Sequence, residues 1–462
     1  MKMKKDYTID MCNGPILKKM LIFAVPLMCS SVLQLLFNAA DIVVVGHFAG
    51  DNSLAAVGSN SALIGLLTNL FVGLSIGTNV LTAKYYGAKN NKQLVKVVHT
   101  SMVLSIISGI VLTVVGVLGA RKVLIWMQTP DEVLELATTY LRIYFLGMTG
   151  TMIYNFGSAI LRAVGDTKRP LYYLFGAGIV NIVLNLFLVI VVKLDVEGVA
   201  IATVISQCIS AYCIIRCLRH EDGGIQLNIC KLKMDKEIFF QILKIGLPAG
   251  FQGILFSLSN VIIQSSVNSF GATIMAGNSA ASNVEQFVYF AMNAFYQSTI
   301  SFTSQNIGAR KYNRINKILL TGQLCVTFVG VVLGNLAVFF GHTLLEMYSS
   351  NEEVIQSGMI RLGIVSRTYA LCGIMDVMVG ALRGIGYSVM PMIVSLIGAC
   401  GLRLVWIATI FQVEKFHTVQ IIYLSYPTTW TITIMIHILC FIWAMKKIKK
   451  STVGNMKLGY VS

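Results

Sequence analysis

Stretches of about twenty apolar residues recur along the whole chain, and an α-helix needs that length to cross a bilayer. Of the 462 residues, 56% are hydrophobic and 12% are charged, which is not expected of a soluble globular domain. We therefore predict an all-α polytopic membrane protein with about twelve transmembrane helices. The expected spans are residues 17–45, 53–80, 94–118, 134–160, 170–192, 198–218, 238–268, 273–303, 315–341, 355–381, 388–411 and 418–445.

Basic residues are concentrated in the loops on one side of the predicted membrane. The opposite loops carry only Arg121, Lys122, Lys193 and Lys415 of the 36 Lys and Arg residues. The formal net charge of +16 therefore follows the positive-inside rule and does not indicate nucleic acid binding. We expect a multi-pass plasma-membrane protein with both termini cytoplasmic. No small-residue cleavage site follows a short apolar region, so the first run is expected to be a retained span and not a signal peptide.

The sequence repeats itself weakly at an offset of about 221 residues. The matches are Pro26 with Pro248, residues 86–89 with 307–310, residues 161–165 with 382–386, and Pro170 with Pro391. Each half would hold about six spans, so we expect two six-helix bundles related by a pseudo-two-fold axis along the membrane normal. The expected division is an N-terminal lobe (1–218), a cytoplasmic linker (219–237), a C-terminal lobe (238–446) and a basic cytoplasmic tail (447–462). Glycines within spans, such as Gly73, Gly77, Gly176 and Gly178, are expected to allow close helix packing.

The first span contains an acidic residue, Asp41, near its end. A carboxylate inside a spanning helix costs roughly 2.5 to 3.5 kcal/mol even on lenient scales, so it marks a transport or proton site by default. Gln34 and Asn38 recur with it at helical spacing, so the three should share a face that looks into the protein. Pro26 removes a backbone hydrogen bond in the middle of the span and creates a place to bend. The alternative is an acid that only ties helices together.

The second half has two further acids within spans, Glu285 and Asp376. Tyr289 lies one helical turn from Glu285, on a mixed polar and aromatic face. We predict that Glu285 lines a substrate cleft and that Asp376 is a second coupling acid, with polar contacts between helices as the alternative. Arg361 is expected to extend toward the outer membrane surface, whereas Arg367 and Arg403 lie deeper and could neutralise either acid.

Several motifs together resemble the multidrug and toxic compound extrusion (MATE) transporters over essentially the full chain. The motifs are the first helix with Pro26 and Asp41, GAKNNK at 87–92, GARKYN at 308–313, LRAVGDTKRP at 161–170, LRGIGYSVMP at 382–391 and NIVLN at 181–185. The resemblance implies a secondary active antiporter that exports lipophilic, mostly cationic compounds by alternating access. It also implies a cation or proton site at Asp41, Asn181, Asn185 and Thr203. Many relatives carry a second acid where this chain has Asn185, which leaves the choice between H+ and Na+ open.

Other functions fit the sequence less well. A lipid-linked oligosaccharide flippase of the same superfamily is the main alternative, but it needs a basic central cavity, whereas Asp41, Glu285 and Asp376 are acidic. A channel does not fit duplicated halves, which indicate alternation. No nucleophile elbow, Walker loop or metal-spaced His or Cys cluster is present, so we expect no enzymatic activity and no cofactor other than H+ or Na+ as the coupling ion. The expected partners are small lipophilic cations and membrane lipid, and the protein is expected to be a monomer.

Overall fold

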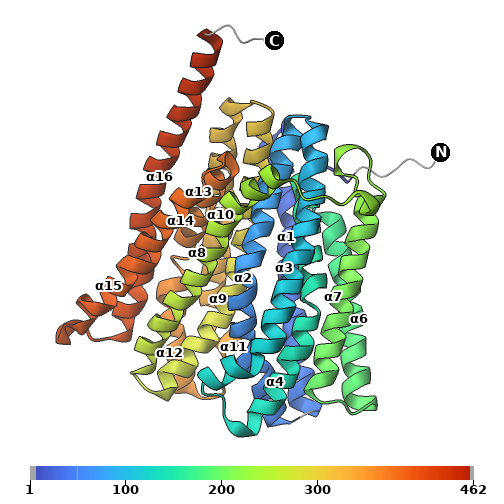
Figure 1. Cartoon of the computed structure of the whole chain (residues 1–462). Helices are drawn as coiled ribbons and strands as arrows, with labels where there is room; N and C mark the ends of the chain where they lie inside the picture. The colour runs from blue at the N-terminus through green and yellow to red at the C-terminus, as the bar shows by residue number, and fades with distance from the viewer. Residues whose placement is uncertain (1–6, 49, 458–462) are drawn as a thin grey trace. The chain divides into compact units, whose positions relative to one another are not determined.

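The computed structural model describes residues 7–48 and 50–457 (Figure 1). Across these residues the regular secondary structure is helical, which confirms the predicted all-α fold class. In the same part of the chain, nine helices are long and apolar enough to cross a membrane. The pair Glu352–Ser366 and Ala370–Ile385, bent by 44°, would make a tenth. The chain is therefore a polytopic helical membrane protein.

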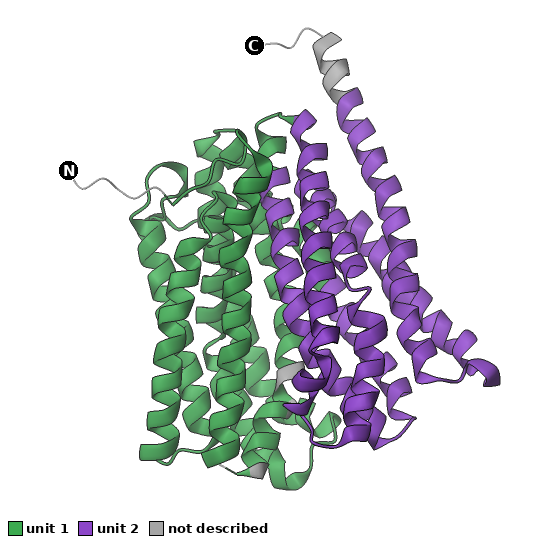
Figure 2. Ribbon diagram, turned by 180° about the vertical axis from the view of Figure 1, so that it is seen from behind, with its two compact units in different colours: residues 1–251, 304–311 green, residues 252–303, 312–462 purple. Residues whose placement is uncertain are grey.

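Two compact units divide the chain (Figure 2). Unit 1 comprises residues 1–251 and 304–311, and unit 2 comprises residues 252–303 and 312–462. Two long helices, α8 (Lys236–Asn268) and α9 (Ala272–Gly308), change unit along their length. These units are a different division from the lobes predicted above, which remain a prediction. Residues 447–457 of the predicted tail continue the last helix, and the rest of the tail lies outside the described residues.

Unit 1 is built from seven helices and the first half of α8. These helices are α1 (Ile16–Phe48), α2 (Asp51–Gly87), α3 (Asn91–Trp126), α4 (Asp131–Leu146), α5 (Met148–Ala163), α6 (Lys168–Leu186), extended by the π-helical turn Phe187–Val191, and α7 (Val196–Arg219). One core cluster joins α3, α5 and α7 through Leu94, Ile160 and Ile214. Ile225 and Leu227 from the linker complete this cluster, so the linker packs onto unit 1.

Unit 2 holds the second half of α8, most of α9 and the helices that follow. These are α10 (Tyr312–Phe339), α11 (Gly341–Glu346), α12 (Glu352–Arg361), the π-helical turn Leu362–Ser366, α13 (Ala370–Ile385), α14 (Val389–Ser395), the π-helical turn Leu396–Gly401, α15 (Leu402–Ala408) and α16 (Val419–Lys457). Its core is strongly aromatic, with Tyr423, Tyr426 and Trp430 from α16 packed against α13 residues such as Met375. Tyrosine and tryptophan bring polar atoms into this core, and those atoms require partners.

The sequence repeat appears in the backbone of the helix ends. Lys89 follows α2 with a φ of 54°, and Arg310 follows α9 with a φ of 56°. Likewise Gly165 follows α5 with a φ of 97°, and Gly386 follows α13 with a φ of 111°. A left-handed residue directly after a helix redirects the chain and lets its amides satisfy the last carbonyls. The two repeats therefore end corresponding helices by the same local geometry.

Glycines permit close helix approach at three of the four predicted positions. A Cβ on Gly73 would lie 2.3 Å from the nitrogen of Gly250, and a Cβ on Gly77 would lie 2.5 Å from the main chain of α8. A Cβ on Gly178 would overlap a phenyl ring of α1, at 1.8 Å from its nearest atom. The packing prediction is thus confirmed for Gly73, Gly77 and Gly178. It is wrong for Gly176, where a Cβ would meet nothing within 4 Å.

Gly308 gives a stability test of one such contact. A Cβ on Gly308 would lie 1.9 Å from the carbonyl oxygen of Lys84, so Gly308→Ala forces α2 and the end of α9 apart. We expect a loss of about 1 to 3 kcal/mol, the usual cost of overpacking, seen as a lower thermal unfolding temperature in detergent. Gly119→Ala is the matched control, because a Cβ on Gly119 meets nothing within 4 Å. Equal unfolding temperatures for the two variants would contradict the contact.

Candidate ion site

Asp41 lies inside unit 1, where three helices meet. Its side chain comes from α1, and the residue is 8% exposed. Asn185 on α6 donates a hydrogen bond from Nδ2 to one carboxylate oxygen of Asp41. The hydroxyl of Thr203 on α7 lies 3.5 Å from the other oxygen. Within the described part of the chain, the buried carboxylate therefore has one direct amide donor and one distant hydroxyl.

The Thr203 hydroxyl can supply little to the carboxylate. It has a single proton, and the carbonyl oxygen of Val199, one turn earlier in α7, accepts from it at 3.0 Å. The contact with Asp41 is longer, so the second carboxylate oxygen of Asp41 accepts only a weak hydrogen bond. A carboxylate in an apolar surrounding with incomplete hydrogen bonding favours neutralisation by a proton or a small cation.

Asn181 and Asn185 lie one turn apart on α6 and complete the cluster. The Nδ2 of Asn185 lies 3.4 Å from Oδ1 of Asn181, and the Nδ2 of Asn181 donates to the Thr203 hydroxyl at 3.3 Å. Asn185 is fully buried, and its Oδ1 has no hydrogen-bond partner among the described residues. Buried oxygens are normally paired. The structure thus brings the four predicted residues together and leaves a neutral oxygen beside the carboxylate.

The other predicted residues of α1 lie apart from this cluster. Gln34 and Asn38 are exposed, whereas Asp41 is buried. Pro26 is buried inside the helix, which continues through it without a break. The hydroxyl of Ser30 donates to the carbonyl oxygen of Pro26 at 2.9 Å. Pro26 leaves the carbonyl of Ile22 without its usual amide donor, and a serine hydroxyl bonded to the carbonyl one turn earlier tends to bend a helix, so both residues favour a bend in this part of α1.

In unit 2, Glu285 is held by a buried arginine. Arg361 Nη2 donates to Glu285 Oε2 at 2.7 Å, and Arg361 Nε lies 3.1 Å from Oε1. Glu285 is 3% exposed and Arg361 is 7% exposed. The prediction that Arg361 extends toward the membrane surface is therefore wrong, because a buried carboxylate binds its guanidinium. Charge-assisted bonds of this kind are among the strongest that side chains form.

Aromatic and amide groups surround this ion pair. Arg361 Nη1 donates to Asn278 Oδ1 at 2.7 Å, and the hydroxyl of Tyr423 donates to the same oxygen at 3.1 Å. The guanidinium also lies 5.6 Å from the ring centroids of Tyr423 and Tyr426. Glu285 is thus part of a satisfied polar network that links α9, α12 and α16.

Three other charged residues of unit 2, Asp376, Arg367 and Arg403, lie outside the Glu285–Arg361 pair. Asp376 on α13 is partly buried and interacts electrostatically with Arg383 and Tyr289. Arg367 is exposed. Arg403 is 5% exposed, and its guanidinium carbon lies 3.9 Å from the ring centroid of Tyr426. The sequence left open whether Arg367 or Arg403 neutralises Glu285 or Asp376. In the structure Arg361 is the partner of Glu285, and Arg383 is the arginine whose charge acts on Asp376.

Sequence reasoning missed three residues near these acids. Tyr140 and Tyr144 on α4 interact electrostatically with Asp41, and their rings stack at 6.0 Å. Their spacing of one helical turn was a signal that could have placed them on one face. Asn278 bridges Arg361 and Tyr423, and its spacing of seven residues before Glu285 was a similar signal.

Comparisons with known proteins agree with this architecture. The MatE family model matches residues 26–187 and again residues 248–409. A probable multidrug resistance protein, YoeA of Bacillus subtilis, is 28% identical over 444 residues, which cover 94% of this chain and 95% of that protein. The multidrug export protein MepA of Staphylococcus aureus is 20% identical over 384 residues and covers 83% of this chain and 85% of its own length.

Solved structures share the fold. An outward-facing multidrug resistance MATE family transporter of the MOP superfamily has a TM-score of 0.89 at 21% identity and covers 97% of this chain and all of its own. A MOP superfamily transporter from Pyrococcus furiosus has a TM-score of 0.88 at 21% identity, with 97% and 99% coverage. The chain therefore has the fold of these multi-helix membrane proteins. The chain belongs to the MatE family, the multidrug and toxic compound extrusion transporters, and the resemblance noted in its motifs is confirmed.

The Glu285–Arg361 pair makes a clear stability prediction. Glu285→Leu alone leaves a buried, unpaired guanidinium and should cost about 3 to 5 kcal/mol, seen as a lower thermal unfolding temperature. Adding Arg361→Met removes both charges and should recover most of that loss. The exposed pair Arg121–Glu135 is the control, and Glu135→Leu should change stability by less than about 1 kcal/mol. A double variant no more stable than the single variant would contradict the pairing.

Proposed function

We propose that the protein is a secondary active multidrug exporter that exchanges lipophilic, mostly cationic compounds for H+ or Na+ by alternating access. The observation that carries the proposal is the buried carboxylate of Asp41 with its incompletely satisfied polar shell. Membership of the MatE family and the names of the relatives, multidrug resistance and export proteins, support the exported class. We propose that the protein is a monomer in the plasma membrane. The charges of its loops favour a cytoplasmic position for both termini.

Ion binding at Asp41 is proposed to change the packing of α1. When Asp41 is ionised, it attracts donors from α6 and α7, here Asn185 and Thr203. A bound proton or Na+ would remove that attraction, and the oxygen of Asn185 that lacks a partner among the described residues would be available to a cation. We propose that α1 then bends at Pro26, where its backbone is weakest.

The charges of unit 2 bear on the exported compound. Arg361 neutralises Glu285, so Glu285 contributes no net charge to a substrate. In the proposal, tyrosines of unit 2 such as Tyr289 contact the apolar rings of the cation. Unpaired buried arginines would instead suit the phosphates of a lipid-linked oligosaccharide. Among the described residues each of the three buried arginines of unit 2 has protein partners: Arg361 pairs with Glu285, Arg383 donates to Tyr296 and Gln252, and Arg403 stacks on Tyr426. This supports export over the flippase alternative.

The role of Asp41 is tested by Asp41→Asn, which keeps the shape of the side chain and removes the charge. We expect efflux of a fluorescent lipophilic cation from vesicles to fall to background, because the variant can no longer exchange a coupling ion. Imposing a pH gradient alone and then a Na+ gradient alone on the unmodified protein identifies that ion. The gradient that drives efflux should be the one whose effect disappears in Asp41→Asn.

Two controls accompany this experiment. Glu132→Gln removes an exposed acid on α4 and should leave efflux unchanged. The thermal unfolding temperature of Asp41→Asn should stay near that of the unmodified protein, because an asparagine can still accept the bond from Asn185. Normal gradient-driven efflux by a well-folded Asp41→Asn variant would exclude Asp41 as the coupling residue.

A further inference from the structure

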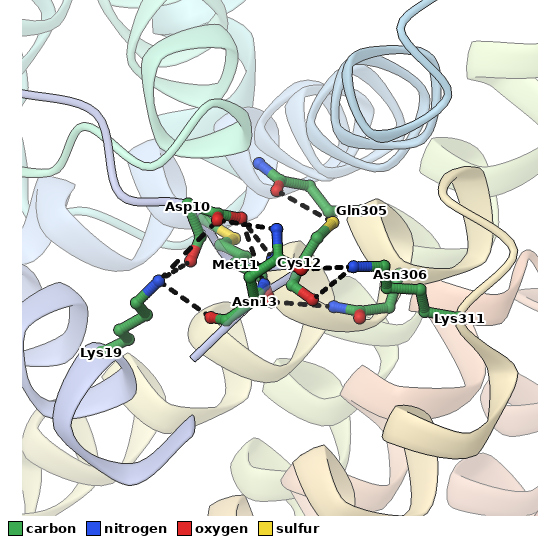
Figure 3. Close-up of polar contacts among 8 residues, drawn as sticks. All are labelled: Asp10, Met11, Cys12, Asn13, Lys19, Gln305, Asn306 and Lys311. Atoms are coloured by element: carbon green, nitrogen blue, oxygen red, sulfur yellow. Dashed lines mark hydrogen bonds and ion pairs between the residues drawn. The ribbon is translucent and has the colours of Figure 1, made fainter. Parts of the chain in front are cut away.

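A short N-terminal segment, residues 7–14, binds the end of α9 within unit 1 (Figure 3). The side-chain amide of Asn306 donates to the carbonyl oxygen of Met11 at 3.1 Å. The ammonium of Lys311 donates to the carbonyl oxygen of Cys12 at 3.1 Å and also to Asn13 Oδ1. The thiol of Cys12 lies 3.9 Å from Oε1 of Gln305. Four contacts of the three neighbouring residues Met11, Cys12 and Asn13 therefore join two parts of the chain almost 300 residues apart.

Hydrogen bonds within the segment and to Lys19 fix its conformation. The carboxylate of Asp10 accepts from the backbone N–H groups of Cys12 and Asn13, at 2.9 and 3.2 Å. The ammonium of Lys19 donates to the carbonyl oxygens of Asp10 and Asn13, at 2.6 and 2.8 Å. Partial burial raises the pKa of Asp10, but hydrogen bonds from Asn13 and Cys12 and the nearby Lys19 outweigh it and hold the pKa below its ordinary value. The turn is thus ionised and preformed at neutral pH.

The segment also fits against the α5–α6 turn. A Cβ on Gly165, whose φ is 97°, would lie 2.5 Å from the nitrogen of Ile9, so the two backbones are in direct contact. Gln305, which faces Cys12, donates to the carbonyl oxygen of Ala163 at 2.7 Å. Met11 is fully buried. The segment therefore fastens the last turn of α9 to the end of α5.

The segment contacts α9 at the point where this helix passes from unit 2 to unit 1. Most of α9 belongs to unit 2, and only its last residues cluster with unit 1. Residues 7–14 hold the end of α9 through amide, ammonium and carbonyl groups, with Met11 as the apolar anchor, while Gly308 packs on α2. Polar contacts of this kind exchange for water at small net cost when they separate.

We propose that residues 7–14 are a releasable strap that keeps the end of α9 fastened and must detach before the protein opens on the side that carries the N-terminal segment. The proposal rests on the alternating access of the proposed function and on the cytoplasmic N-terminus that the loop charges favour. Detachment would break the contacts of Asn306 and Lys311 and withdraw Met11 from its buried position. Asn306 and Lys311 act as positioning residues, because they act through the strap and not on the ion or the substrate.

Cross-linking tests the strap directly. In Gln305→Cys, a mild oxidant takes two electrons and two protons from the new thiol and Cys12 and joins them as a disulfide. We expect cross-linked protein to lose efflux of the fluorescent cation and to regain it on reduction. Cys12→Ser in the same background is the control, and oxidant should leave its efflux unchanged. Cross-linked protein that transports at the rate of the reduced protein would overturn the proposal.

A second measurement does not depend on transport. In Asn306→Ala with Lys311→Ala, a maleimide should modify Cys12 at least about fivefold faster, the factor expected from losing one net hydrogen bond. Mass spectrometry of the Cys12 peptide separates this thiol from the other cysteines. Lys317→Ala, an exposed lysine on α10, is the matched control and should label at the unmodified rate. An unchanged labelling rate in the double variant would overturn the strap. If the unmodified protein showed no efflux of any cation, the proposed function would fail while this assay still decided whether the strap exists.

Discussion

The cost of holding the Asp41 carboxylate away from water organises unit 1. Among the described residues, Asp41 accepts from one amide of α6 and lies near a distant hydroxyl of α7, although a buried carboxylate can accept several bonds. The position of α1 against α6 and α7 is therefore coupled to the charge on one side chain. A helix held partly by an ionised group moves to a new equilibrium when that group is neutralised. This coupling is what an ion-driven transporter requires.

Unit 2 also buries a carboxylate, that of Glu285, but gives it a full set of partners. Glu285 receives a bidentate guanidinium from Arg361, and Asn278, Tyr423 and Tyr426 satisfy or cover the arginine. A network in which each member has its partner resists change, because removing any one member leaves a buried charge. The sequence repeat duplicates helix ends and prolines but not the acids. The two halves therefore share a backbone pattern and differ in the chemistry of their interiors.

Local signals in the sequence were enough to predict the helices, the repeated helix ends and the face of α6 that carries Asn181 and Asn185. Periodicity and spacing act within a few turns, and these features lie within that range. The partner of Glu285 could not be predicted in this way, because Arg361 lies 76 residues away on another helix. The strap escaped prediction for the same reason, since Met11 and Asn306 are 295 residues apart and residues 7–14 have no periodic pattern. The exposure of Gln34 and Asn38 depends on the neighbours of α1, which the sequence of α1 alone does not contain.

The contacts of Asp41 and those of the strap at the end of α9 differ in chemistry for a physical reason. At Asp41 the change must follow ion occupancy, so the contact depends on a full charge whose neutralisation alters its attraction to Asn185. At the end of α9 the contacts must open and reform repeatedly, so they are built from several weak hydrogen bonds around one buried methionine. An extended apolar contact there would expose its surface to water at each opening, at about 25 cal/mol for every Å². Hydrogen bonds exchange with water at far smaller net cost, which suits a contact that is proposed to open and reform in each turnover.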